Sequence, residues 1–183
     1  MKQRIQRSDS VKGFTLVELL VTISVAMILL AVAVPRFREM LAGYQLNTQA
    51  NDFISNSNFA KSEAIRLGRR VTLCPSTNGA DCAAVDWEQG WIIFDDPDND
   101  ATRDAGETLL AVHAALPAGA TMTGNANVDS YISFTADGTA RLMNSTAFQS
   151  GTVTLCQQNR ALGYAIVLSS TGRVRVDTVN NCP

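Results

Sequence analysis

The chain has 183 residues and a formal net charge of −2, and its length is that of one ordinary domain with an extension. Its four cysteines include no Cys-x-x-Cys pair and His113 is the single histidine, which argues against a zinc site. No nucleophile motif accompanies that histidine, and we therefore expect a protein that is not an enzyme.

The chain begins with a basic segment followed by a long apolar run. Residues 1–13 carry four basic residues and one acidic residue, whereas residues 14–34 carry a single charge, Glu18. As a helix this run spans about 30 Å, which matches the hydrocarbon core of a bilayer. A buried core helix is the alternative. The basic flank on one side favours a membrane span, with the N-terminus in the cytoplasm and residues 36–183 across the membrane.

A helical pattern continues beyond the apolar run. From Phe37 to Leu67, apolar residues recur at intervals of three, four or their sums, and Gly68 follows as a C-terminal stop. We therefore predict one helix over residues 14–67. Its second half must bury an apolar face, and a sheet is the simplest partner.

After Gly68 the sequence changes to short segments rich in β-branched and aromatic residues. The predicted strands are residues 70–74, 90–94, 108–113, 131–134, 139–142, 151–156, 164–170 and 173–179. Turn sequences such as Asn78-Gly79 separate them. The predicted fold class is therefore α+β: a long N-terminal helix packed on an antiparallel β domain, residues 68–183, with one sheet or two small ones.

All four cysteines lie in the β-rich part of the chain. Outside the cytoplasm, four cysteines indicate two disulfides, for which three connectivities exist. We favour Cys74–Cys82 with Cys156–Cys182, because the first pair closes a short loop rich in turn residues.

Glu18 lies within the apolar run, where an isolated carboxylate is costly and usually has a partner. The run itself contains no basic residue. Cleavage after Gly13 would create a positive charge, because the new α-amino group of Phe14 lies four residues before Glu18 and on the same side of a helix. Between staggered copies, the amine of one chain could meet Glu18 of another.

These residues resemble the processing site of type IV prepilins. In KGFTLVELL a basic leader ends in Gly13, Phe14 follows, and a glutamate stands at the fifth position of the mature chain. Pro35 resembles the helix-kinking proline of the same proteins. The resemblance implies that a prepilin peptidase removes the leader and methylates Phe14, and that Glu18 helps to register the subunit among other pilins in a filament.

Five further segments are similar to the FimT/GspH family of minor pilins and pseudopilins. They are SEAIRLGRRVTLCPS (62–76), WEQGWIIFDD (87–96), SFTADGTARL (133–142), GTVTLC (151–156) and SSTGRVRV (169–176). The resemblance implies a small β-rich domain on a pilin helix, present in few copies in a filament. It does not choose between a type IV pilus and a type II secretion system.

The segment TGRVRVDTV, residues 171–179, predicts a hairpin turn followed by a strand. Alternate side chains of a strand share a face, so Arg173 and Arg175 should project together, about 6.5–7 Å apart. Val174 and Val176 should then face the core. Two guanidinium groups at this spacing can each bind a phosphate of a nucleic-acid backbone.

The same arginines, with Gly172, match a Gly-Arg-x-Arg motif that resembles the DNA-binding element of FimT proteins used in natural transformation. Arg141 and Arg160 are weaker candidate members of the patch. Removal of the leader leaves 11 basic and 16 acidic side chains, and Asp177 shares the arginine face. DNA binding would therefore be local, weak and salt-dependent, and an ordinary solvated strand face is the alternative.

A second candidate site is DPDNDATRDAGE, residues 96–107. Oxygen-bearing side chains occupy positions 1, 3, 5, 7, 9 and 12 of an EF-hand-type calcium loop: Asp96, Asp98, Asp100, Thr102, Asp104 and Glu107. The loop departs from that pattern with Ala101 in place of glycine, with Pro97, and with flanking segments that resemble strands. Calcium is the only cofactor that the sequence suggests, and a solvated acidic hairpin loop is the alternative.

These observations predict a FimT-like minor type IV pilin. Its helix would hold it in the inner membrane with the β domain in the periplasm, before it joins other pilins in a surface pilus that binds DNA for uptake. The alternative is a GspH-like minor pseudopilin, a structural and protein-interaction subunit of a type II secretion system. Its arginines would then contact protein or solvent.

Overall fold

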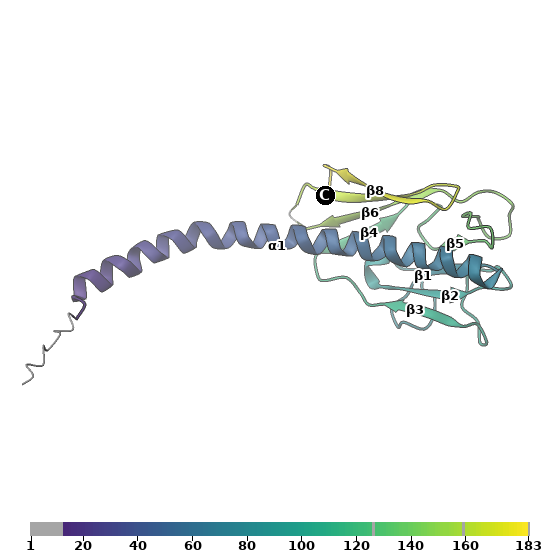
Figure 1. Ribbon diagram of the computed structural model, residues 1–183, viewed down its shortest axis with the longest axis horizontal. Coiled ribbons are helices and arrows are strands. Elements are labelled where there is room, and N and C mark those ends of the chain that lie inside the picture. The colour runs from purple at the N-terminus through teal and green to yellow at the C-terminus, as the bar shows by residue number, and fades with distance from the viewer. Residues whose placement is uncertain (1–12, 126, 159, 183) are drawn as a thin grey trace, which may run out of the picture. The chain divides into compact units, whose positions relative to one another are not determined.

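The computed structural model describes residues 13–125, 127–158 and 160–182, so the predicted leader lies outside the described residues except for Gly13. The elements follow the chain as Figure 1 shows. They are α1 (Leu16–Leu67), β1 (Val71–Pro75), η1 (Trp87–Gln89), β2 (Trp91–Asp95), β3 (Leu109–His113), β4 (Ala120–Gly124), β5 (Ile132–Phe134), β6 (Gly151–Gln157), β7 (Gly163–Leu168) and β8 (Val174–Val179).

The structure divides into two compact units between Leu41 and Ala42, within helix α1. In the first unit every described residue is exposed, and α1 is long and apolar enough to cross a membrane by length and composition. The helix begins two residues later than predicted because Thr15 caps it: the Thr15 hydroxyl accepts a hydrogen bond from the Glu18 N–H at 3.2 Å. Glu18 is therefore the third residue of the helix, where the positive end of the helix dipole stabilises a negative charge.

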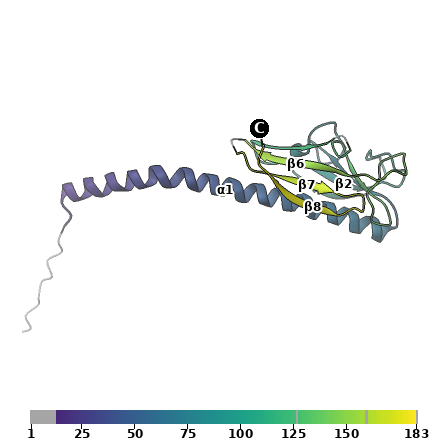
Figure 2. The ribbon, with the colours of Figure 1, turned by 90° about the horizontal axis from the view of Figure 1, so that it is seen from above.

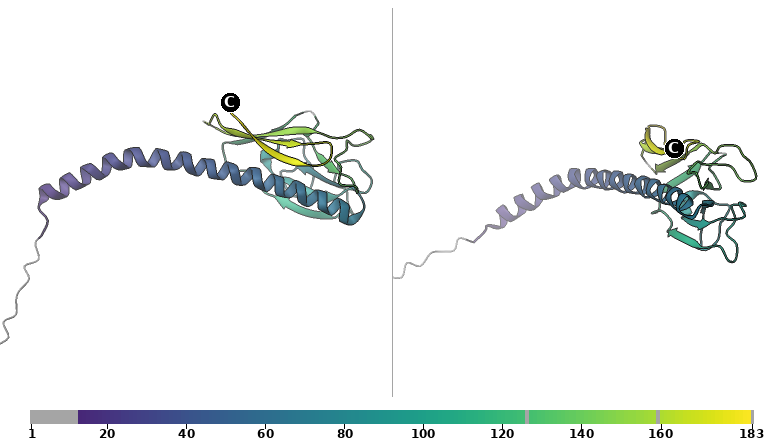
Figure 3. Two further views of the ribbon diagram at one scale, coloured as in Figure 1. Left: turned by 45° about the horizontal axis from the view of Figure 1, so that its top comes forward. Right: turned by 45° about the vertical axis from the view of Figure 1, so that its right-hand side comes forward.

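The second unit contains two antiparallel four-stranded sheets, which confirms the predicted α+β class. The first sheet has the strand order β3-β2-β1-β5 and the second has the order β4-β6-β7-β8. The part of α1 that belongs to this unit runs along both sheets, as Figures 1 and 3 show. Strand β8 is last in the order of the second sheet. Among the described strands it pairs only with β7, so it is an edge strand (Figure 2).

One apolar core joins the helix to both sheets. The buried apolar residues of α1 follow helical spacing: Leu46, Ala50, Phe53, Ala60 and Ala64. Residues of both sheets belong to the same cluster, among them Leu73 of β1 and Ile166 of β7. Because the core and all four cysteines lie after Leu41, residues 42–183 form a unit that can fold without the apolar run.

The structure corrects two of the strand predictions. Residues 139–142 form no strand and make only single bridges, Ala140 with Phe134 and Arg141 with Phe148, because the chain turns again directly afterwards. Strand β4, with the sequence ATMTG, was not predicted. It has only one large apolar side chain, Met122, so its alternating pattern is weak.

Both favoured disulfides are present in the structure. Cys74–Cys82 lies on the outer face of the first sheet, where Cys74 packs with Ile92 and Phe94 in a small second cluster. Cys156–Cys182 connects β6 to the segment that follows β8. The second bridge therefore holds the end of the edge strand to the sheet.

Candidate functional site

The Gly-Arg-x-Arg segment lies at the turn between β7 and β8. In this hairpin Arg175 pairs with Val167 and Val174 pairs with Leu168. Leu168 is buried and Val174 packs against the core, so Arg175 projects from the opposite face of the sheet. Arg173 and Arg175 are both exposed, in agreement with a strand face that presents two guanidinium groups.

The strand pattern predicted the correct side of the sheet for Val176 but not its exposure. Val176 was expected to face the core, but it is 41% exposed. It lies opposite Ile166 on the core side of the sheet. Because β8 is the edge strand, no further strand of the described chain lies beyond it to cover this side chain. Of the two valines, Val174 is the one that packs on the core cluster.

The two arginines border an open hollow of about 250 Å³. Its other lining residues are Val167, Ser169 and Thr171. The Ser169 hydroxyl donates to the Arg173 carbonyl and accepts from the Arg173 N–H, both at 3.1 Å, so it closes the turn. The hollow is therefore polar at its turn end and positively charged on one side.

The two guanidinium groups differ in their partners. Arg175 forms an ion pair with Asp177 at 3.1 Å, and both side chains are more than half exposed. Such an exposed pair contributes little energy, so a competing anion can displace it. Among the described residues, the guanidinium of Arg173 has no hydrogen-bond or ion-pair partner.

A third cation at this turn was not found in the sequence. Lys61 of α1 donates from Nζ to the carbonyl oxygens of Thr171 and Gly172, at 3.2 Å each. Lys61 therefore fixes the turn to the helix and adds positive charge next to the arginines. No local pattern signals this role, because the contact joins residues 110 positions apart.

Gly172 has two reasons to be glycine. Its φ is +70°, a left-handed conformation that costs other residues about 1–2 kcal/mol. A Cβ atom at this position would also collide with the carbonyl oxygen of Gly138. The turn thus needs glycine both for its backbone angle and for the close approach of two loops.

Gly172→Ala is expected to lower the free energy of unfolding by more than Gly68→Ala. Gly68 has nearly the same φ, +68°, but a Cβ there would meet nothing within 4 Å. Gly68→Ala should therefore cost only the backbone term, about 1–2 kcal/mol, and Gly172→Ala should add the collision with Gly138. Urea unfolding of residues 42–183 measures both; equal losses would contradict the close contact.

The structure does not bring Arg160 to the hollow. Arg160 lies between β6 and β7, and its guanidinium lies beside Gly43 of α1. A Cβ atom added at Gly43 would be 3.2 Å from Nη1 of Arg160. The hollow is at the other end of β7, where Leu168 pairs with Val174. The length of β7, six residues or about 17 Å as far as strands rise, separates the two sites.

Arg141 also uses its guanidinium elsewhere. It lies 4.5 Å above the ring of Phe148 and donates to the Thr146 carbonyl at 2.6 Å. Asp137 is 4.0 Å away. Arg141 thus belongs to its own loop, and the pair that lines the hollow is Arg173 with Arg175.

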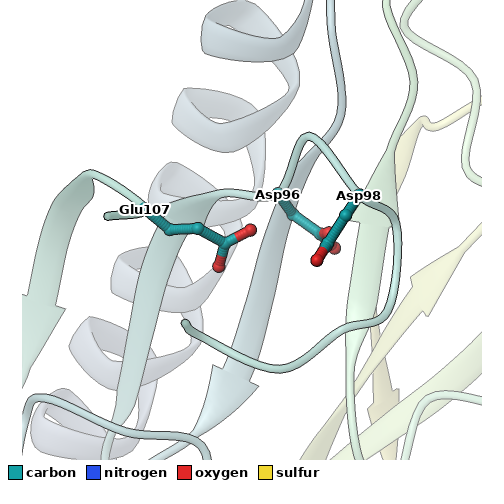
Figure 4. A group of neighbouring side chains, drawn as sticks. All are labelled: Asp96, Asp98 and Glu107. Atoms are coloured by element: carbon teal, nitrogen blue, oxygen red, sulfur yellow. The ribbon is translucent and has the colours of Figure 1, made fainter. Parts of the chain in front are cut away.

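The acidic segment forms the loop between β2 and β3, as Figure 4 shows for three of its carboxylates. Asp96 is fully buried and accepts hydrogen bonds from the Thr72 hydroxyl at 2.7 Å and from the N–H groups of Asp100 and Ala101. Glu107 is 9% exposed, and its Oε2 accepts from the N–H of Asp104 at 2.9 Å.

The carboxylates of five of the six predicted ligands form two groups that share Asp98. Carboxylate oxygens of Asp96, Asp98 and Glu107 lie within 4.8 Å of one another, as do those of Asp98, Asp100 and Asp104. The sixth, Thr102, donates its N–H to Asp100 at 2.7 Å. Burial raises the pKa of Asp96, and burial followed by the charges of the neighbouring aspartates raises the pKa of Glu107.

The residues of the predicted processing site lie in the first unit. Gly13 precedes the helix, Phe14 is 81% exposed, Glu18 is in the first helical turn and Pro35 lies inside α1. Gly13 and Phe14, on either side of the predicted cleavage position, are therefore exposed, and the apolar part of α1 is not buried by the described residues.

A long apolar N-terminal helix with two antiparallel sheets is the fold of type IV pilins. The crystal structure of the minor pilin FimU of Pseudomonas aeruginosa matches with a TM-score of 0.55 and 20% identity, over 75% of this chain and 92% of FimU. The minor pseudopilin EpsH from the type 2 secretion system of Vibrio cholerae matches with a TM-score of 0.50 and 10% identity, over 73% of this chain and 96% of EpsH. These likenesses define the fold.

Two family models match the sequence itself. The model for type II transport protein GspH covers residues 49–172, and the model for the prokaryotic N-terminal methylation motif covers residues 9–34. The chain therefore belongs to the GspH family, whose members are structural pilins and pseudopilins. No curated protein matched the chain. Family membership and the apolar helix indicate a membrane-anchored subunit that assembles with other pilins in a filament.

Proposed function

We propose that the chain is a FimT-like minor type IV pilin without enzymatic activity. Its precursor is held in the inner membrane with the leader in the cytoplasm and the β domain in the periplasm. A prepilin peptidase cleaves between Gly13 and Phe14 and methylates Phe14, and Glu18 and Pro35 act in filament assembly. The methylation motif over residues 9–34 and the uncovered apolar helix support this step.

We further propose that the pilus-borne domain binds DNA for uptake in natural transformation. The observation that carries this proposal is the hollow at the β7–β8 turn, where Arg173 and Arg175 project from one strand face. The guanidinium of Arg173 is free of polar partners among the described residues, and Lys61 adds a third cation. Gly172 lets the turn pack closely and so fixes where the arginines point.

The chemistry of the hollow favours the phosphate backbone over the bases. Guanidinium groups bind phosphate oxygens through paired N–H donors, and such contacts carry no sequence preference. Both large aromatic candidates for base stacking, Trp87 and Trp91, are fully buried. Two phosphate contacts predict a slope of log K against log salt of about −1.4 for single strands and about −1.8 for duplex DNA.

The test is DNA binding by residues 42–183 with both disulfides formed. We expect Arg173→Ala/Arg175→Ala to remove salt-dependent binding, because both phosphate contacts are lost. Fluorescence anisotropy with labelled single-stranded and duplex DNA across a salt series measures this. Two variants serve as controls: Arg66→Ala removes an exposed arginine of α1 that pairs with Glu63 and should leave binding unchanged, and Asp177→Asn should strengthen it by freeing Arg175.

A GspH-like minor pseudopilin is the second candidate function. The family description, type II transport protein, and the likeness to EpsH favour it. The mature side chains also carry more acidic than basic groups, which opposes DNA over most of the surface. If the folded wild-type domain binds no DNA even at low salt, the structural role in a secretion system becomes the better proposal.

A further inference from the structure

We propose that residues 96–107, the acidic loop between β2 and β3, bind a calcium ion. The loop supplies five carboxylates from twelve consecutive residues: Asp96, Asp98, Asp100, Asp104 and Glu107. This site is separate from the arginine hollow, because it belongs to the first sheet whereas β7 and β8 belong to the second. Neither the family match nor the proposed DNA site calls for it.

The distances between the oxygens suit a single hard cation. Calcium binds oxygens at about 2.3–2.6 Å, so two ligands on opposite sides of one ion lie about 5 Å apart. Carboxylate oxygens of Asp96, Asp98 and Glu107 all lie within 4.8 Å of one another. Asp98 also belongs to the second group, with Asp100 and Asp104, so the two groups share a ligand.

An independent observation points to a missing positive charge. Glu107 is nine-tenths buried, and its Oε1 atom is inaccessible to solvent and has no hydrogen-bond partner among the described residues. Figure 4 shows its carboxylate directed toward those of Asp96 and Asp98. A buried carboxylate directed toward two others is unfavourable unless a cation lies between them or one of them is protonated.

Arg70 interacts electrostatically with Asp96, but it forms no salt bridge with that carboxylate. In the described part of the chain none of the five carboxylates takes part in a salt bridge. The basic residue of the loop, Arg103, donates instead to the carbonyl oxygens of Ala80 and Glu107. Burial is the main cause of the raised pKa values of Asp96 and Glu107, and it disfavours their charged forms.

The backbone of the loop also makes the turn that calcium loops require. EF-hand loops have glycine at position 6 for a sharp turn. Ala101 occupies this position and adopts φ +62°, so the turn is made although alanine is disfavoured there. Many carboxylates from one loop favour calcium over magnesium, which retains several waters and demands near-ideal octahedral geometry.

The test is calcium titration of residues 42–183 after treatment with a chelator, followed by calorimetry and by the shift in melting temperature. We expect one site with a Kd of about 10⁻⁴–10⁻³ M or tighter, in the range of extracellular calcium modules. Magnesium should bind at least tenfold more weakly. The melting temperature should rise with calcium and return to its starting value with chelator.

Two variants locate the site. Asp98→Asn changes an exposed side chain, so the domain should fold normally while its calcium affinity falls at least tenfold. Glu107→Gln should have opposite effects in the two conditions: a higher melting temperature than wild type without calcium, because it removes a buried charge, and a lower one with calcium. Asp129→Asn removes an exposed carboxylate outside the loop and should leave both values unchanged.

Three results would overturn the proposal. The first is no binding heat and no melting shift up to 10 mM calcium, about ten times the weakest Kd expected. The second is an unchanged calcium affinity in a folded Asp98→Asn variant. The third is an equal calcium effect in Glu107→Gln and wild type, which would show general charge screening by the ion.

Discussion

Phe53→Ala is expected to lower the free energy of unfolding of the domain by about 3–5 kcal/mol. Phe53 is fully buried on α1, and its ring meets the rings of Trp87 and Trp91 edge-on, with centroids 5.1 Å apart in both pairs. The substitution removes an aromatic side chain from the junction of helix and sheet. It also removes both edge-to-face contacts, which add to the loss of buried area.

Denaturant unfolding of residues 42–183, followed by tryptophan fluorescence, measures this loss because both indole rings contact Phe53. Phe59→Ala is the matched control: it removes the same side chain from the same helix, at a position 38% exposed. Its loss should be clearly smaller. Similar losses for the two variants would mean that the helix does not pack through Phe53.

Removal of the Cys156–Cys182 bridge by the double change to alanine is expected to cost about 3.5 kcal/mol. The bridge spans 26 residues, and the loop-closure model relates this length to the entropy that the bridge removes from the unfolded chain. The loss should also free the segment after β8, because β8 pairs with only one strand. Unfolding in urea under oxidising conditions measures the loss.

The Cys74–Cys82 bridge is the internal comparison. It spans only eight residues, so the same model predicts a smaller loss, about 2.5 kcal/mol, for its double replacement by alanine.

The proposed DNA binding should survive the loss of Cys156–Cys182 at low temperature, because Lys61 and Gly172 hold the opposite end of β8. If DNA binding through Arg173 and Arg175 disappears when this bridge is removed from a folded domain, the turn alone does not position the two guanidinium groups.

Local sequence patterns determined most of the architecture. The helix was predicted to end at Leu67 and does so, because Gly68 takes the left-handed conformation that ends a helix. The alternation of Arg173, Val174 and Arg175 predicted one exposed face, since strand side chains alternate whatever the sheet packs against. The pattern was less informative in β4, where threonine and glycine leave little contrast between the two faces.

The remaining features depend on which distant residues the fold brings together. The sequence alone placed Arg160 in one patch with Arg173 and Arg175. In the structure the length of β7 separates Arg160 from the hollow at the β7–β8 turn. Lys61 joins the turn only because α1 lies against the second sheet.

The acidic loop shows the same division between sequence and structure. Its carboxylates could be found from their spacing, which is local. The sequence could not show that Glu107 is buried with one unpartnered oxygen, or that its carboxylate is directed toward Asp96 and Asp98. Spacing along a helix, strand or loop follows from backbone geometry, whereas burial and contacts between distant residues follow from how the helix and sheets pack.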